Sequence, residues 1–483
     1  MSERYDLVII GGGPGGYTAA EHAAKLGMST AVIEMGEIGG SCVNLGCIPA
    51  KALLQAATVY RDIKRASHFG LSADHVSFSM EAMQKFREET VAKVRSGISR
   101  RLDAAGVEVI CGEAKLHREN SVEIRTAAGI RYVSGERVII ATGSDPIIPD
   151  IPGVMLPQVM RSHEILKSTQ WNFNRLSIVG GGVVGVELAT LFASLGSEVT
   201  LFERSTRLLC TMDETISEYI KRSLEDKGVR VLLGVTVTEI TEQIPALDSG
   251  PVLVHFRKGN VTRSIPADRV LTAVGRKPDL AKVLAEDAEV KLDSFGKPKV
   301  TPSFLTTQPG CYAIGDTVSR MRLAHVATSH ATFVVEHMAK KSHRMLLSVV
   351  PNGMYVVLPV VPICIYTDPE IASVGFTEAE AATYNMKVKI GMTLMDENSK
   401  AIMLGKTIGF VKVIFEAYTN TLVGAQIVCS RATDMIGEMA TAIANGLTAY
   451  QLTTAMRAHP TYSEAIAEAV EDALRDDQKE GQE

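Results

Sequence analysis

The chain has 483 residues, 46% of them hydrophobic, and a formal net charge of −5 at pH 7. This length suits about three domains of ordinary size, and the acidic excess argues against a nucleic-acid partner. The chain passes from Glu3 and Arg4 directly into an apolar run, so we expect no signal peptide and a cytoplasmic location. Seven cysteines, an odd number, argue against a secreted disulfide framework.

The N-terminal segment carries a dinucleotide-binding fingerprint. An apolar run starting at Tyr5 is followed by Gly11, Gly13 and Gly16 in GxGxxG order, and then by helix-forming residues. These glycines let the backbone approach a pyrophosphate at a helix N-terminus. The next predicted strand ends at Glu34, whose carboxylate is placed to accept hydrogen bonds from an adenosine ribose. Together these features predict a Rossmann-like unit.

Two cysteines follow this fingerprint in the segment GGSCVNLGCIPAK, from Gly39 to Lys51. Oxidation of Cys42 and Cys47 would close a short ring, and Pro49 fits the first position of a helix whose amide dipoles point at Cys47. A thiolate is stabilised in such a place, so we predict a lowered pKa for Cys47 and a redox-active pair. Two ordinary buried cysteines are the alternative. Zinc would need more ligands, and we predict no metal site.

A second fingerprint lies in LSIVGGGVVGVELATLFASLGSEVTLFE, with Gly180, Gly182 and Gly185 as its glycines and Glu203 at the end of the second strand. The interval from the third glycine to the acidic residue is the same in both copies. The sequence therefore predicts two dinucleotide sites. Glu203 would repel a 2′-phosphate, so the second site should prefer NAD over NADP.

The remaining sequence completes the predicted organisation. After the second fingerprint, GCYAIGDTVS reads as a buried strand ending at Gly315 and Asp316, and a helical pattern follows it. Alternating strands and two amphipathic helices then form a C-terminal α+β region. We predict an α/β fold with two Rossmann-like domains (1–149 and 150–275), a central domain (276–345) and a C-terminal domain (346–483). The most apolar stretch, Leu346 to Tyr366, is interrupted by prolines, so we expect no membrane-spanning helix.

The last region carries RAHPTYSEAIAEAVE, in which His459 precedes a proline turn and Glu464 starts a helix. A carboxylate that orients an imidazole fixes its tautomer and raises its basicity, so this pair could deprotonate a thiol before it attacks a disulfide. The alternative is a capped helix with an incidental histidine.

The segment GGSCVNLGCIPAK, the paired fingerprints, AIGD, LAH, YTDPEIASVG and AHPTYSE occur in the order found in dihydrolipoamide dehydrogenases. The chain resembles that family over nearly its whole length. The resemblance implies FAD in the first unit, NAD in the second, and a C-terminal dimerisation domain. It implies a homodimer in which each active site is completed by His459 of the partner subunit. The implied substrate is a dihydrolipoyl group on a lipoyl-carrying protein of a 2-oxo acid dehydrogenase, acetoin or glycine cleavage complex.

Carried over residue by residue, the resemblance implies that Cys42 exchanges with substrate, that Cys47 meets the flavin, and that His459 with Glu464 serves as the base. It implies that Lys51 lies beside the reactive edge of the flavin and pairs with Glu187. The implied FAD-binding residues are Gly11, Gly13, Gly16, Glu34, Lys51, Ala114, Ser144, Asp316 and Ala324. The implied NAD-binding residues are Gly180, Gly182, Gly185, Glu187, Glu203, Val237 and Gly275.

Three alternatives stay open at this point. A glutathione-type reductase would share the cysteines and His459 but would need basic residues in place of Glu203. A reductase of another oxidised substrate, such as a metal, is the second, and a non-enzymatic FAD- and NAD-binding scaffold is the third. The chain departs from the family pattern at Ser41, Ala50 and Arg457, and the segment Ser342 to Val361 reads unlike the shorter connection expected there.

Overall fold

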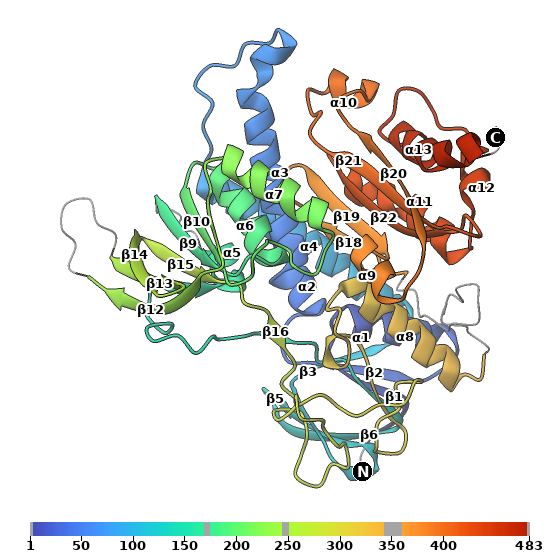
Figure 1. The fold of residues 1–483 in the computed structure, drawn as a ribbon. Coiled ribbons are helices and arrows are strands. Elements are labelled where there is room, and N and C mark those ends of the chain that lie inside the picture. The colour runs from blue at the N-terminus through green and yellow to red at the C-terminus, as the bar shows by residue number, and fades with distance from the viewer. Residues whose placement is uncertain (1–2, 169–173, 244–250, 342–359, 481–483) are drawn as a thin grey trace.

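The computed structural model describes residues 3–168, 174–243, 251–341 and 360–480. Figure 1 shows three lobes: a first sheet near the N-terminus, a second sheet unit beside it, and a C-terminal sheet on the third side. The helices α2 (Gly40–Asn44) and α3 (Cys47–Lys64) lie between them. The predicted α/β fold with two Rossmann-like units and a C-terminal α+β region is confirmed.

The first sheet has the strand order β3-β2-β1-β6-β5-β4, and β17 also pairs with β6. Leu7, Val8 and Ile9 of its first strand are completely buried, as expected for a parallel strand covered on both faces. The strands of this sheet are β1 (Glu3–Ile10), β2 (Thr30–Glu34), β3 (Glu108–Cys111), β4 (Glu113–Leu116), β5 (Ser121–Thr126), β6 (Gly129–Ile140) and β17 (Cys311–Ala313).

Helices from distant parts of the sequence cover this sheet. Helix α1 packs closely against α8, because its buried residues Ala19, Ala20 and Ala23 are small. The helical segments here, besides α2 and α3, are α1 (Pro14–Lys25), η1 (Ala66–Phe69), α4 (Met80–Ala104), η2 (Arg118–Asn120), η3 (Gly315–Thr317) and α8 (Ala324–Met338).

The second unit repeats the strand, turn and helix arrangement in a parallel sheet of order β11-β10-β9-β15-β8, with an antiparallel sheet β12-β13-β14 beside it. Its parallel strands are β8 (Val159–Arg161), β9 (Arg175–Val179), β10 (Glu198–Glu203), β11 (Arg230–Leu233) and β15 (Arg269–Thr272). The antiparallel strands are β12 (Thr236–Glu242), β13 (Val252–Lys258) and β14 (Val261–Ala267), and the helices are α5 (Ser162–Lys167), α6 (Val183–Ser194) and α7 (Glu214–Asp226).

The chain then returns to the first unit. Strand β16 (Arg276–Lys277) pairs with β7 (Asp145–Pro146), and β17 joins the first sheet with Cys311 opposite Val138. This return brings η3 and α8 to the same end of the sheet as the first glycine turn. Residues that are far apart in the sequence can therefore contribute to one site.

The C-terminal sheet is antiparallel, with the order β18-β19-β22-β21-β20. Strands β21 and β22 are buried along their whole length, as their apolar sequences predict. Gly391 lets helix α13 lie close, since a Cβ there would be 1.9 Å from the Ala469 carbonyl oxygen. The elements are β18 (Ile363–Ile365), β19 (Glu370–Gly375), α9 (Glu378–Thr383), β20 (Val388–Leu394), α10 (Ser399–Met403), β21 (Phe410–Glu416), β22 (Leu422–Cys429), α11 (Ala432–Ala444), α12 (Ala449–Thr453) and α13 (Glu464–Glu480).

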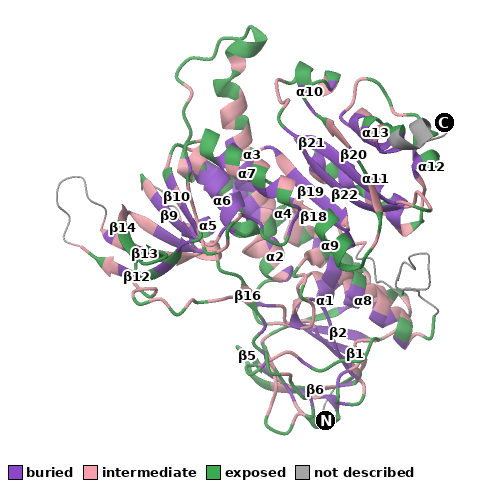
Figure 2. Cartoon of the chain, in the orientation of Figure 1, coloured by how far each residue is buried: buried purple, intermediate pink, exposed green. Residues whose placement is uncertain are grey.

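One hydrophobic cluster joins the three lobes. It contains Leu53 of α3, Leu191 of α6 and Phe410 of β21, all fully or almost fully buried (Figure 2). The helical stretch Gly40–Lys64 is apolar and long enough to cross a membrane by length and composition. In this structure the stretch consists of two helices, α2 and α3, and α3 packs against α4 and α6.

A buried ion cluster ties the second unit to the C-terminal sheet. Lys412 Nζ on β21 donates to Asp213 Oδ1 at 2.8 Å, to Thr215 Oγ1 at 3.1 Å and to Glu378 Oε1 at 2.8 Å. The side chains of Lys412 and Asp213 are 3% and 4% exposed, so neither charge is solvated. Removing one partner leaves the other charge buried without compensation.

We predict that Lys412→Met lowers the free energy of unfolding by about 3–5 kcal/mol, because the Asp213 carboxylate would stay buried without its cation. The added substitution Asp213→Asn should restore part of that loss, since Asn can still cap α7 by accepting from the Thr215 amide. Urea unfolding of both variants checks this. Lys406→Met, which breaks the more exposed pair with Asp62, is the control and should cost less than about 1 kcal/mol. An equal loss for the two lysine variants would contradict the prediction.

Candidate active site

The two cysteines lie on a tight loop against the first glycine turn. Cys42 is in α2, and Cys47 is the first residue of α3. The Gly39 amide donates to the Gly12 carbonyl at 2.8 Å, and a Cβ at Gly40 would lie 2.7 Å from the Gly13 Cα atom. The loop is therefore pressed onto the fingerprint. The predicted helix start at Pro49 was wrong by two residues, because the amide of Ala50 already bonds the Gly46 carbonyl and the first turn forms at Cys47.

The two sulfurs are free thiols with very different acidities. The hydrogen bond that the Cys42 thiol donates to the Cys47 sulfur, together with the Lys51 charge, lowers the pKa of Cys47 to about 7. Desolvation and the Glu187 charge oppose that shift. The same hydrogen bond and burial raise the pKa of Cys42 well above its usual range. The lowered pKa of Cys47 agrees with the expectation from the sequence, although the thiol contact contributes more than the helix terminus.

A pH dependence follows from this order of acidities. We predict that alkylation of Cys47 in the reduced protein is half-maximal near pH 7, while Cys42 stays unmodified well above that pH, because only the thiolate reacts. Iodoacetamide labelling across pH with peptide mapping measures both sites. A midpoint for Cys47 at the ordinary thiol value of about 8.5 would contradict the prediction.

Lys51 and Glu187 form an ion pair next to the dithiol. Lys51 Nζ lies 2.9 Å and 2.7 Å from the two carboxylate oxygens of Glu187, joining α3 to α6. The Glu187 side chain is 5% exposed, and its Oε1 also accepts the Tyr366 amide at 2.9 Å. The Lys51 ammonium lies over the Tyr366 ring, 4.8 Å from its centroid. Burial raises the pKa of the Tyr366 hydroxyl to about 12, so it stays neutral.

The first fingerprint forms an open anion-binding turn. Gly11 has φ +103°, and a Cβ on Gly16 would lie 1.8 Å from the Gly11 carbonyl oxygen, so the turn admits only glycine at these places. Gly13 is the N-cap of α1 and has no side-chain cap, so the first amides of α1 are free to bind an anion. Glu34 accepts from the amides of Gly12 at 2.7 Å and Gly36 at 2.9 Å, which holds its carboxylate beside the turn.

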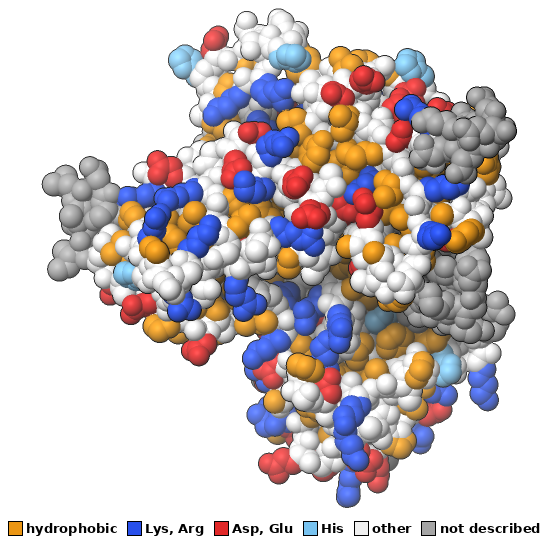
Figure 3. Space-filling view, in the orientation of Figure 1, with side chains coloured by type: hydrophobic (Ala, Val, Ile, Leu, Met, Phe, Trp, Pro, Cys, Tyr) orange, Lys and Arg blue, Asp and Glu red, His pale blue; other side chains and the backbone are white. Residues whose placement is uncertain are grey.

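The second fingerprint has the same geometry. Gly180 has φ +114°, and a Cβ on Gly185 would lie 1.9 Å from the Gly180 carbonyl oxygen. Gly182 caps α6 without a side chain and with open space around it. Glu203 accepts from the Gly181 amide at 2.7 Å, as Glu34 does in the first unit. In Figure 3 the surface next to β16 is hollowed. Lys and Arg side chains gather around this hollow, which suits anionic ligands.

The other predicted contact residues lie at several places. Ser144 donates to Asp316 Oδ2 at 2.6 Å, so the structure brings these two together from distant parts of the chain. Ala324 is the first residue of α8, which has no side-chain cap. Ala114 is in β4, and buried Val237 is in β12 of the antiparallel sheet. Gly275, with φ +117°, lies between β15 and β16.

His459 and Glu464 contact each other but lie away from the dithiol within one chain. His459 Nδ1 is 2.8 Å from Glu464 Oε1, and the other carboxylate oxygen accepts the Thr461 amide at 2.7 Å. Those two bonds lower the pKa of Glu464. The His459 side chain is 70% exposed, and α12 and α13, which flank it, lie at the outer edge of the molecule, far from α2 (Figure 1).

The sequence did not single out two residues that the structure places in this site. Tyr366 contacts both members of the Lys51 and Glu187 pair, and Arg276 donates through Nε to Ser144 Oγ at 3.0 Å. Tyr366 follows β18 and Arg276 begins β16, and both segments return to the site from other parts of the chain. The motif YTDPEIASVG was noted as a whole, but nothing local in it distinguishes Tyr366 as a contact residue. The apolar segment Leu346–Tyr366 lies mostly outside the described residues, as does most of Ser342–Val361.

Comparison with known proteins assigns the chain to a family. The model of the "Pyridine nucleotide-disulphide oxidoreductase" family matches residues 5–331. The model of the "Pyridine nucleotide-disulphide oxidoreductase, dimerisation domain" matches residues 361–470. The first match contains the dithiol, the Lys51 and Glu187 pair and both glycine turns, and the second contains His459 and Glu464.

The chain aligns with individual relatives over nearly the full length of both chains. The chain is 35% identical to a dihydrolipoyl dehydrogenase of Chlorobaculum tepidum, covering 98% of both chains. It is 34% identical to a dihydrolipoyl dehydrogenase of Bacillus subtilis, covering 97% of this chain and 98% of that one. Among solved structures it is similar to the Cu(II) complex of the HOCl-induced flavoprotein disulfide reductase RclA from Escherichia coli, with 26% identity, a TM-score of 0.83, and coverage of 98% and 99%.

Proposed function

Because the chain belongs to the pyridine nucleotide-disulphide oxidoreductase family, we propose that it oxidises a protein-bound dihydrolipoyl group to the lipoyl disulfide and reduces NAD+ to NADH, with FAD between them. The observation that carries this proposal is the dithiol pressed against the first glycine turn and flanked by the Lys51 and Glu187 pair. The near full-length likeness to dihydrolipoyl dehydrogenases supports the choice of substrate.

The described residues fit both dinucleotides. FAD would take the first turn, with Gly11, Gly13 and Gly16 at its pyrophosphate, Glu34 at its ribose, and Ser144, Asp316, Ala114 and Ala324 around it. NAD would take the second turn, with Gly180, Gly182, Gly185, Glu203, Val237 and Gly275. The uncapped first turns of α1 and α6, which contain no acidic residue, support this assignment because they leave amide donors for phosphate. Bound FAD would accept the electron pair from the dithiol and pass it to NAD+ as hydride.

The chain's own groups support the thiol chemistry in two steps. A substrate thiolate attacks Cys42 of the oxidised pair, the Cys42–Cys47 bond breaks, and Cys47 leaves as a thiolate. The second substrate thiolate attacks the mixed disulfide, so that the lipoyl ring forms and Cys42 leaves with the electron pair and takes up a proton. The lowered pKa of Cys47 makes it the better leaving group, and Lys51 stabilises its charge.

His459 is proposed to accept the proton of the substrate thiol. Its Nδ1 is held by Glu464, which leaves Nε2 for substrate. Because this histidine is far from the dithiol of its own chain, we propose a homodimer in which His459 of the partner subunit completes each site. The match of residues 361–470 to a dimerisation domain supports that arrangement. The complex that carries the lipoyl group, the domain boundaries at 149, 275 and 345, and the cytoplasmic location stay predictions.

The test is steady-state turnover by the purified, FAD-loaded protein. We expect NADH formation from dihydrolipoamide and NAD+, a much slower reaction with NADP+ because Glu203 would repel a 2′-phosphate, and no consumption of NADPH with oxidised glutathione. A further assay measures the reduction of Cu(II) by NADH, because the chain is similar to RclA, whose structure was solved as a Cu(II) complex. Turnover with glutathione or Cu(II) but not with dihydrolipoamide would reject the proposed substrate.

A further inference from the structure

A short loop, Tyr366 to Pro369, crosses between the three lobes beside the ion pair. At its first residue, the Tyr366 amide donates to Glu187 Oε1 at 2.9 Å, and the Tyr366 ring lies under the Lys51 ammonium. The loop leads from β18 into β19 of the C-terminal sheet, whereas Lys51 lies on α3 and Glu187 on α6. One residue from the C-terminal region thus contacts both members of the pair, Lys51 through its ring and Glu187 through its backbone amide.

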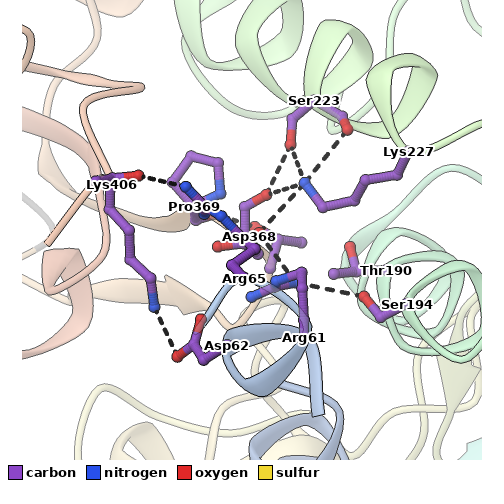
Figure 4. Close-up of polar contacts among 12 residues, drawn as sticks. Arg61, Asp62, Arg65, Thr190, Ser194, Ser223, Lys227, Asp368, Pro369 and Lys406 are labelled. Carbon is purple, nitrogen blue, oxygen red and sulfur yellow. Dashed lines mark hydrogen bonds and ion pairs between the residues drawn. The ribbon is translucent and has the colours of Figure 1, made fainter. Parts of the chain in front are cut away.

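The other end of the loop is held by charges from both neighbouring lobes. Arg61 of α3 lies 2.9 Å from Asp368 Oδ2, and Lys227 at the end of α7 lies 3.4 Å from the same oxygen. Figure 4 shows these two cations reaching Asp368 from different elements. Lys227 Nζ and Ser223 Oγ each also donate to the Asp368 carbonyl at 2.7 Å.

These contacts are more enclosed than an ordinary surface ion pair. The side chains of Arg61, Lys227 and Asp368 are 18%, 20% and 28% exposed. Charges at that depth are screened less than surface charges, and three donor groups make four contacts with one residue. Asp368 therefore fixes the loop to α3 and α7 at once, and the backbone carries that constraint over two residues to Tyr366.

We propose that Asp368, clamped by Arg61 and Lys227, is a positioning residue that sets the Lys51 and Glu187 pair beside the dithiol through Tyr366. The chain of contacts is continuous: α3 and α7 hold Asp368, the loop holds Tyr366, and Tyr366 limits where the Lys51 ammonium and the Glu187 carboxylate lie. When the loop is released, Lys51 gains freedom and solvent, and it stabilises a thiolate at Cys47 less. The proposal concerns the same site as the proposed function, and it stands on these contacts whichever disulfide is the substrate.

The test measures the Cys47 thiolate directly, without any lipoyl substrate. The pH dependence of iodoacetamide labelling at Cys47 is determined for the reduced, FAD-loaded protein and for the variants Tyr366→Leu, Asp368→Asn and Arg61→Met. Tyr366→Leu should raise the midpoint and slow labelling at pH 7 by about two- to threefold, because the cation–π contact is lost. Asp368→Asn and Arg61→Met should shift it in the same direction.

Two matched controls lie within the same cluster. Asp62 is next to Arg61 on α3 and pairs with Lys406 at 3.1 Å, so Asp62→Asn also breaks an ion pair between α3 and the C-terminal region but does not touch the loop (Figure 4). Tyr366→Phe keeps the ring and the backbone amide. Both controls should show the wild-type midpoint. Melting temperatures, measured in parallel, separate positioning from a loss of stability.

The proposal is overturned if Asp368→Asn and Arg61→Met keep the wild-type midpoint for Cys47 while only their melting temperatures fall. It is overturned equally if Asp62→Asn shifts the midpoint as much as they do, because the effect would then belong to any contact between the lobes. Failure of dihydrolipoamide turnover with the midpoint shifts intact would reject the proposed substrate and leave the positioning role standing.

Discussion

Cys47→Ser is expected to reduce the rate of NADH formation from dihydrolipoamide by roughly 10³-fold or more, because the electron pair must pass through this sulfur. Serine keeps the size of the side chain but cannot form the disulfide or leave as a stable thiolate. Cys42→Ser should be as damaging, since no substrate mixed disulfide can form. Steady-state kinetics on FAD-loaded variants measures both.

A matched control separates redox chemistry from general damage. Cys111 is an exposed free thiol at the end of β3, so Cys111→Ser should leave the rate unchanged. The Cys47→Ser protein should still bind FAD, because the glycine turn and Glu34 are intact. Retained turnover in Cys47→Ser would mean that the dithiol is not on the electron path.

The substitution His459→Gln is expected to lower turnover by about 10²–10⁴-fold, the usual contribution of a general base. Glutamine can still bond Glu464 but cannot take a proton from a thiol. His117→Gln is the control, since His117 Nδ1 lies 2.8 Å from Asp287 Oδ1, the same contact in a part of the first unit away from the proposed site. The loss should be smaller at high pH, where dihydrolipoamide ionises without help. A uniform loss at all pH values would contradict a role as base.

The proposed sharing of the active site between subunits allows a stronger form of this prediction. Cys47→Ser and His459→Gln homodimers should each be nearly inactive, but subunit exchange between equal amounts creates mixed dimers with one intact site. Such a mixture should regain about a quarter of the wild-type activity, because half the dimers are mixed and each has one working site. No recovery after demonstrated exchange would show that His459 acts within its own chain or not at all.

The sequence predicted those parts of the site that depend on short-range patterns. Both glycine turns need glycine at fixed places, since Gly11 and Gly180 have positive φ and Gly16 and Gly185 leave no room for a Cβ. The acidic ends of β2 and β10 follow from the strand, turn and helix order. The contact of His459 with Glu464 also needs only a local turn, and the structure confirms that contact.

The sequence patterns could not predict contacts between residues that are far apart in the chain. Tyr366 reaches the Lys51 and Glu187 pair only because the C-terminal sheet packs on α3 and α6, and Arg276 reaches Ser144 only because β16 pairs with β7. The different acidities of the two thiols likewise depend on which sulfur donates to the other and on the position of the Lys51 charge, neither of which the spacing of Cys42 and Cys47 reveals.

The most direct test of the central claim is a single anaerobic turnover without NAD+. One equivalent of dihydrolipoamide is added to the oxidised, FAD-loaded protein, and the thiols are trapped with iodoacetamide and mapped by mass spectrometry. The account predicts that lipoamide forms while label appears at Cys47, which holds the thiolate, and at Cys42 only once the protein is unfolded. Formation of lipoamide with both cysteines still in a disulfide and the electrons elsewhere, or no reaction at all, would contradict it.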